Sequence, residues 1–69
     1  MIYIVVTGDL DVDFNIHSVY KNKYLAVEMA TKLVRESYHS DKYVFSEDTN
    51  RMKWIYNNSY ISVVWYNFD

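Results

Sequence analysis

The 69-residue sequence contains no cysteine, one glycine and no apolar run of membrane-spanning length. Without cysteine the chain forms no disulfide, no thiolate metal site and no thiol nucleophile. A single glycine, Gly8, excludes the glycine-rich loops that bind nucleotide phosphates. The first residues lack both the basic start and the long apolar core of a secretory signal. We therefore expect a cytoplasmic protein without a membrane anchor.

The sequence also lacks a surplus of basic residues. Its formal net charge is −2 at pH 7 and its pI is about 5.5. A dedicated DNA-binding domain usually carries a strong positive charge, so nucleic acid is not the expected partner. Binding of single-stranded nucleic acid stays open as a minor alternative, because an open sheet with exposed aromatic residues can stack bases.

Hydrophobic and aromatic residues are abundant. They make up 51% and 19% of the chain, and eight tyrosines and two tryptophans are among them. This composition is too apolar for a disordered chain. A chain of this length forms one domain and buries only about 60% of the surface that its unfolded form exposes. We therefore expect more aromatic surface than its own core can hide.

The order of the elements predicts an α+β fold. Apolar runs and alternating patterns predict strands at residues 2–7, 9–17, 42–46, 52–56 and 59–68. A helix is predicted at 23–38, with Asn22 as its N-cap and the small Ala26 and Ala30 facing a sheet. Turns are predicted near residues 8–11, 47–50 and 57–58. The expected architecture is a single antiparallel sheet of four to five strands (β-β-α-β-β-β) with one helix on one face.

One helix covers only one face of such a sheet, so the other face should be open. Neighbouring residues of a strand point to opposite faces, so the aromatic residues of the last strands cannot all be covered. An exposed aromatic patch usually marks an interaction site. The candidate partner-binding aromatic residues are Trp54, Tyr56, Tyr60, Trp65 and Tyr66.

Three aspartates stand at alternate positions, Asp9, Asp11 and Asp13. A calcium loop of the EF-hand type that began at Asp9 would need a glycine and a glutamate where Phe14 and Tyr20 stand. We therefore expect no metal site and interpret the three carboxylates as one solvated side of the strand at 9–17. They could also attract a basic surface, so they join the candidate partner-binding residues.

No catalytic arrangement is recognisable. His17 and His39 are isolated histidines, and we interpret both as surface residues. Residues 39–41 combine the three residue types of a hydrolase triad, but triads assemble from residues far apart in the sequence. We therefore expect a protein that is not an enzyme and that binds no cofactor.

The first half of the chain has a recognisable pattern. An apolar strand that begins with tyrosine is followed by a Gly/Asp turn, a strand with an apolar-x-x-Val step, a lysine-rich cap and an alanine-bearing helix. The segments are Tyr3-Ile4-Val5-Val6, Gly8-Asp9, Ile16-His17-Ser18-Val19, Lys21-Asn22-Lys23 and Leu25-Ala26-Val27. Over about residues 1–34 this pattern resembles small phage-encoded ββα-type proteins of the host-takeover and anti-defence kind. The tail with Trp54 and Trp65 lies outside the resemblance.

The resemblance implies a protein that binds and blocks a host protein, such as a restriction or CRISPR component, in the cytoplasm of an infected bacterium. The leading expectation is therefore a small non-enzymatic inhibitor with a host protein as its target. The alternative is a homo-oligomeric structural or accessory protein, in which a two-fold pairing of sheet faces or edge strands covers the aromatic residues.

Overall fold

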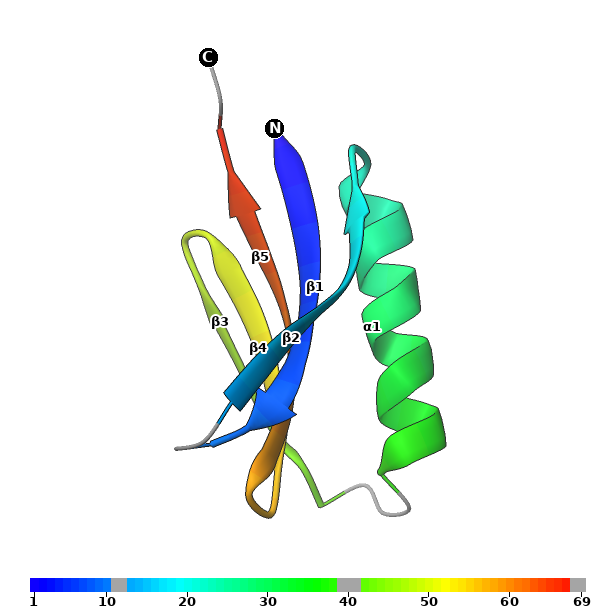
Figure 1. The fold of residues 1–69 in the computed structure, drawn as a ribbon, viewed down its shortest axis with the longest axis vertical. Coiled ribbons are helices and arrows are strands. Elements are labelled where there is room, and N and C mark those ends of the chain that lie inside the picture. Colours follow the sequence, from blue (N-terminus) through cyan, green and yellow to red (C-terminus); the bar gives the residue numbers. More distant parts are fainter. Residues whose placement is uncertain (11–12, 39–41, 68–69) are drawn as a thin grey trace.

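The computed structural model describes residues 1–10, 13–38 and 42–67, with only the backbone of Asp13. One five-stranded antiparallel sheet and one helix form the fold (Figure 1), which confirms the predicted α+β class and the β-β-α-β-β-β order. The elements are β1 (Ile2–Asp9), β2 (Asp13–Tyr20), α1 (Lys23–Ser37), β3 (Val44–Asp48), β4 (Arg51–Tyr56) and β5 (Ser59–Tyr66).

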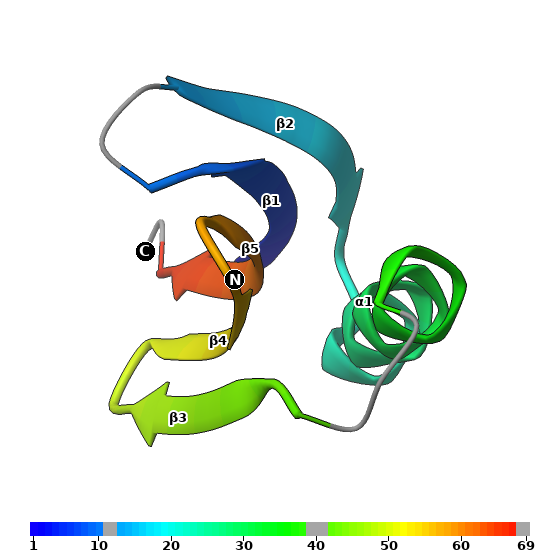
Figure 2. The ribbon, with the colours of Figure 1, turned by 90° about the horizontal axis from the view of Figure 1, so that it is seen from below.

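The strands lie in the order β2-β1-β5-β4-β3, and every neighbouring pair is antiparallel. The first and last strands therefore pair in the centre, and β2 and β3 form the two edges. Helix α1 connects these edges along one side of the sheet (Figure 2). We call the side under α1 the helix face and the opposite side the open face.

The helix begins where the sequence predicts. The side-chain Oδ1 of Asn22 accepts hydrogen bonds from the backbone N–H groups of Tyr24 at 2.8 Å and Leu25 at 3.4 Å. These bonds satisfy amides that have no partner within the helix. The last helical residue is Ser37, one residue before the predicted end. The N–H of the next residue, Tyr38, still donates to the carbonyl of Val34 at 2.9 Å.

The core lies between α1 and the helix face. Ala26 and Ala30 have no exposed surface, as the prediction of a close helix–sheet contact requires. Beneath them Val5 of β1 and Val63 of β5, which pair in register, are also completely buried. Small side chains on the helix bring its backbone close to the two central strands, and this contact excludes water.

The strand predicted at residues 9–17 is present, but its bounds are shifted toward the C-terminus. β1 continues through Gly8 to Asp9, and β2 begins only at Asp13. Gly8 lies inside β1 rather than in a turn, and its φ is not positive. The error arises because alternating aspartates and apolar residues continue the period-two pattern across the chain reversal.

Strand β2 contains a β-bulge. Val5 pairs with Ser18, whereas the next residue, Val6, pairs with Ile16, so His17 is an extra residue in β2. A bulge bends the strand and interrupts regular pairing along its free edge. The sequence analysis did not predict this feature.

The β3–β4 hairpin is shifted from its predicted position. Strand β3 is Val44–Asp48 rather than residues 42–46, because the turn contains only Thr49 and Asn50. Asp48 therefore pairs with Arg51 in register, and their side chains form an ion pair at 3.3 Å.

The β4–β5 hairpin confirms the predicted turn at residues 57–58. Asn57 has a φ of 54°, the left-handed conformation that asparagine tolerates well. Strand β5 ends at Tyr66, and Phe68, included in the predicted strand, lies outside the described residues. Within the part of the chain that the structure describes, no helix has the length and apolar character needed to cross a membrane.

Candidate protein-binding face

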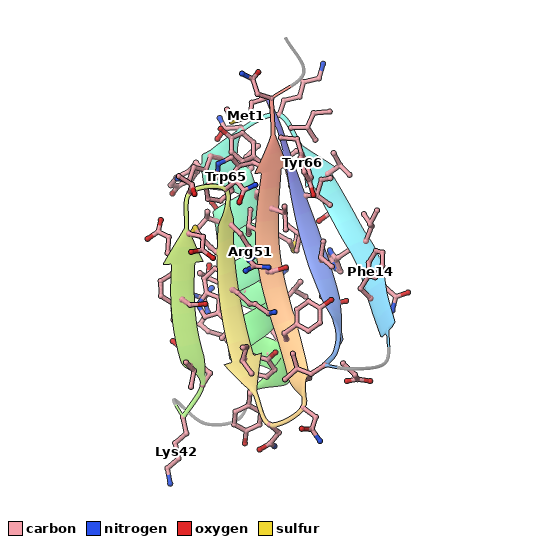
Figure 3. All side chains as sticks on the ribbon, turned by 90° about the vertical axis from the view of Figure 1, so that its left-hand side faces the viewer. Met1, Phe14, Lys42, Arg51, Trp65 and Tyr66 are labelled. Atoms are coloured by element: carbon pink, nitrogen blue, oxygen red, sulfur yellow. The ribbon has the colours of Figure 1, made fainter. Side chains whose placement is uncertain are left out.

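Large apolar side chains are exposed on the open face. Phe14, Ile16 and Val19 of β2 are 63%, 59% and 54% exposed, and Tyr66 of β5 is 49% exposed. Together they leave on the order of 400 Å² in water, comparable to the largest apolar patch of a typical monomer. Figure 3 looks onto this face, with α1 behind the sheet. These apolar side chains of β2 stay in water because no described element covers their side of the strand.

The sheet register arranges the open face in rows, because residues opposite each other on antiparallel strands point to the same side. Three rows cross all five strands: Phe14–Gly8–Tyr60–Ile55–Val44, Ile16–Val6–Ser62–Lys53–Ser46 and Val19–Ile4–Val64–Arg51–Asp48. The charged residues of these rows lie on β3 and β4. On β2, β1 and β5, the apolar members of these rows and the neighbouring pair Ile2 and Tyr66 form a surface that we call the apolar strip. It consists of Ile2, Ile4, Val6, Phe14, Ile16, Val19, Tyr60, Val64 and Tyr66.

Gly8 interrupts the apolar strip. It lies between Phe14 on β2 and Tyr60 on β5 in one row. Because its φ is not positive, the backbone of β1 does not require a glycine at this position. What glycine provides here is the absence of a side chain, which lets another surface approach the strand closely.

Asp48, Arg51 and Lys53 on β3 and β4 form the charged corner of the open face, and all three contact other side chains. Arg51 Nη2 lies 3.3 Å from Asp48 Oδ2 on the neighbouring strand. The Nζ of Lys53 lies 4.8 Å from the centroid of the Tyr60 ring, a cation–π contact. Both basic side chains of this face thus contact other side chains of the same chain.

The structure divides the five predicted aromatic residues between the two faces. Tyr60 and Tyr66 lie on the open face, whereas Trp54, Tyr56 and Trp65 lie on the helix face. Trp54 is only 6% exposed and belongs to the core. Its predicted place in an exposed patch is therefore wrong, because its strand position puts the ring on the covered side of the sheet.

Of the five predicted aromatic residues, Tyr56 and Trp65 are partly buried on the helix face. Trp65 lies next to Tyr3, with ring centroids 5.9 Å apart, and the Nζ of Lys23 lies 4.6 Å from its ring centroid. Tyr56 stacks on Tyr38 with centroids 5.0 Å apart. Both residues therefore have intramolecular partners, and their predicted role in partner binding stays a prediction.

The aspartate row is only partly described. Asp9 is exposed at the end of β1, opposite Asp13 in register. Asp11, the side chain of Asp13 and residues 39–41 lie outside the described residues. Among residues 1–10, 13–38 and 42–67, no three histidine, aspartate or glutamate side chains form a cluster that could hold a metal ion.

Among the titratable groups of the described residues, the buried hydroxyl of Tyr38 is the one whose pKa the fold clearly shifts. Burial raises its pKa above the ordinary value of 10.0, and the nearby Ser59 lowers it by less. Among the described residues this oxygen has no hydrogen-bond partner, and the Ser59 hydroxyl donates to the Tyr56 carbonyl at 2.9 Å.

Phe14, Ile16 and Val19 are the site residues that the sequence analysis missed. The strand predicted at residues 9–17 includes Phe14 and Ile16 but not Val19, and alternation alone does not show which face the helix covers. No protein-family model matches the chain, and no significant match was found among curated proteins or solved structures. The surface chemistry of the described residues is therefore the basis for a functional proposal.

Proposed function

We propose that the protein is a non-enzymatic protein-binding module and that the apolar strip is its contact surface. The observation that carries this proposal is the exposure of Phe14, Ile16 and Val19, each more than half exposed on one strand. Apolar surface gathered in one place gains free energy when another protein covers it. Scattered apolar residues would need no such explanation.

Within the described part of the chain, neither the depression beside α1 nor the charged residues of the open face favour a small ligand. A depression of about 220 Å³ lies between β2 and α1, lined by Tyr20, Leu25, Glu28, Met29 and Lys32. This volume is below the roughly 300 Å³ at which small-molecule pockets begin. On the open face, Arg51 and Lys53 already contact Asp48 and Tyr60, which disfavours phosphate binding there.

The centre of contact should lie around the gap at Gly8. Phe14 and Tyr60 flank this glycine in one row, and aromatic residues are typical binding anchors. Tyr66 provides a further exposed ring at the other end of β5. A partner side chain that enters the gap would contact both flanking rings and the bare backbone of β1.

The resemblance of residues 1–34 to phage-encoded proteins supports a host protein as the target. In this proposal the module blocks a surface that the host protein needs, as a stoichiometric inhibitor. A rigid sheet suits such a role because little conformational entropy is lost on binding.

An affinity capture from host lysate tests this proposal. The lysate is treated with nuclease, and three tagged forms serve as bait: the wild type, Ile16→Lys and Val44→Lys. Ile16 and Val44 both lie on the open face and are 59% and 65% exposed, but only Ile16 belongs to the apolar strip. The same charge is thus introduced inside and outside the proposed contact surface.

We expect one stoichiometric protein with the wild type and with Val44→Lys, and its loss with Ile16→Lys. Capture that is equally strong with all three baits would contradict the proposed contact surface. Trp54→Ala is not a suitable probe, because this ring is in the core and its removal would affect the fold.

A further inference from the structure

We propose that, in the absence of its target, the apolar strip packs against the apolar strip of a second copy of this chain. The inference rests on the proposed function in one respect, since both use the same surface. Self-association would then compete directly with target binding. The geometry of the open face supports a second copy through its area, its distribution of charge and the protection of both sheet edges.

The exposed area is close to the minimum for a specific dimer. Two copies of Phe14, Ile16, Val19 and Tyr66 would contribute on the order of 800 Å² in total. A specific interface needs about 1,000 Å². The partly exposed Ile4, Val6 and Val64, which lie between these residues, can supply the remainder. An interface at this lower limit of size is typical of weak, reversible association.

The charged corner selects one orientation of the two sheets. If the two-fold axis runs along β1, β2 of one copy lies over β5 of the other, and β4 and β3 extend beyond the overlap. Arg51, Lys53 and Asp48 then stay in water at the rim, as polar residues do in protein interfaces. An axis across the strands would instead place β4 over β4 of the second copy and bring the basic Arg51 and Lys53 of both copies together, which like charges oppose.

Both edges of the sheet carry features that discourage strand-to-strand pairing. Strand β3 has only five residues and ends in Glu47 and Asp48, and charges on a short edge oppose the addition of another strand. Strand β2 is longer, but the extra residue His17 interrupts the regular spacing of its free edge. Packing of faces is therefore favoured over pairing of edges.

Sedimentation equilibrium of the purified protein, without any target, tests the inference from about 5 to about 500 µM. The wild type, Ile16→Lys and Val44→Lys are compared. We expect the wild type and Val44→Lys to form dimers with similar dissociation constants. A lysine at position 16 would be buried in the apolar interface twice per dimer, so we expect Ile16→Lys to weaken association about 100-fold or more.

A second variant, a test of folding and NMR contacts distinguish loss of the interface from loss of the fold. Val19→Lys, on the same strand and also exposed, should give the same loss of association. Circular dichroism establishes that each variant keeps its fold. In a mixed sample with one isotope-labelled copy, filtered NMR should detect contacts between the Phe14 ring of one copy and the Tyr60 ring of the other, which lie in the same row.

The outcomes separate this inference from the proposed function. A wild type that is monomeric up to about 500 µM, or a folded Ile16→Lys that still forms dimers, overturns the inference. Target capture that is lost with Ile16→Lys leaves the proposed function standing in either case. Loss of dimers with Ile16→Lys supports the inference whether or not this variant still captures the target. If the variant loses dimers but still captures the target, the inference stands and the proposed contact surface for the target is contradicted.

Discussion

The two faces of the sheet are both apolar, yet they are in different environments. On the helix face, Val5 and Val63 are completely buried beneath Ala26 and Ala30. On the open face, the apolar side chains of the edge strand β2 face water, and Ile16 is more than half exposed. The comparison shows that apolar composition on its own does not place a side chain in the core. The position of the single helix decides which face is buried.

The difference also separates residues that stabilise the fold from residues that are available for binding. Burial of a side chain under α1 contributes to the free energy of folding. An apolar side chain that stays exposed contributes little to folding, and it gains that free energy only when a partner covers it. Substitutions matched between the two faces should therefore affect different measurements.

The largest expected effect comes from a matched pair of aromatic truncations. Trp54→Ala removes a buried ring from the helix face and should lower the free energy of unfolding by about 3–5 kcal/mol. Tyr66→Ala removes a ring that is half exposed on the open face, and we expect a change of about 0.5 kcal/mol or less. Urea denaturation at low protein concentration measures both values. Equal losses for the two variants would contradict the division into a structural and a binding face.

A smaller effect should follow when the cover of the helix face is weakened. Asn22→Ala removes the side-chain acceptor for the N–H groups of Tyr24 and Leu25. We expect a loss of about 1 kcal/mol in the free energy of unfolding. Asn22→Ser, which keeps a capping oxygen, serves as the control and should lose much less. A similar loss for serine and alanine would mean that the cap does not stabilise α1.

Gly8→Val sharpens the comparison because its two effects have opposite signs. Gly8 has an ordinary strand conformation, so valine should raise monomer stability by up to about 1 kcal/mol. The same side chain fills the gap between Phe14 and Tyr60 and should weaken self-association. Urea denaturation and sedimentation equilibrium measure the two effects separately. Association as strong as that of the wild type would show that the gap has no role in the contact.

The smallest effect at neutral pH is expected for Tyr38, which is buried beside Tyr56. Burial raises the pKa of its hydroxyl, so the folded state holds the proton more tightly than the unfolded chain. This contribution to stability is complete below about pH 10 and is lost as pH rises through the folded pKa. We expect Tyr38→Phe to reduce the loss of stability above pH 10, measured by thermal unfolding at several pH values. An unchanged alkaline profile would contradict this role.

The sequence predicts the elements of this fold well. The N-cap at Asn22, the helix and the hairpin at Asn57 follow from side chains that satisfy backbone groups or tolerate unusual conformations locally. The reversal between β1 and β2 was misplaced by several residues, because alternating Asp and apolar residues hide it. Elements with a local chemical signal were thus predicted correctly. Prediction of the boundary failed where two neighbouring strands continue the same alternating pattern.

The site could be predicted only in part. The sequence indicates an uncovered face, because one helix cannot cover two sides, but alternation does not show which side the helix chooses. Tyr60 and Tyr66 were therefore grouped with Trp54, which the structure buries. The choice depends on tertiary packing of Ala26 and Ala30 against the central strands, and one strand considered alone does not contain that information.

The bulge at His17 changes the phase of the alternation within a single strand. Before it, Phe14 and Ile16 point to the open face; after it, Tyr20 pairs with Tyr3 and points to the helix face. An uninterrupted period of two would send Tyr20 to the same side as Phe14. Deletion of His17 would therefore remove the phase change without moving any face: Ser18 would directly follow Ile16, every remaining side chain would keep its side of the sheet, and the free edge of β2 would become regular.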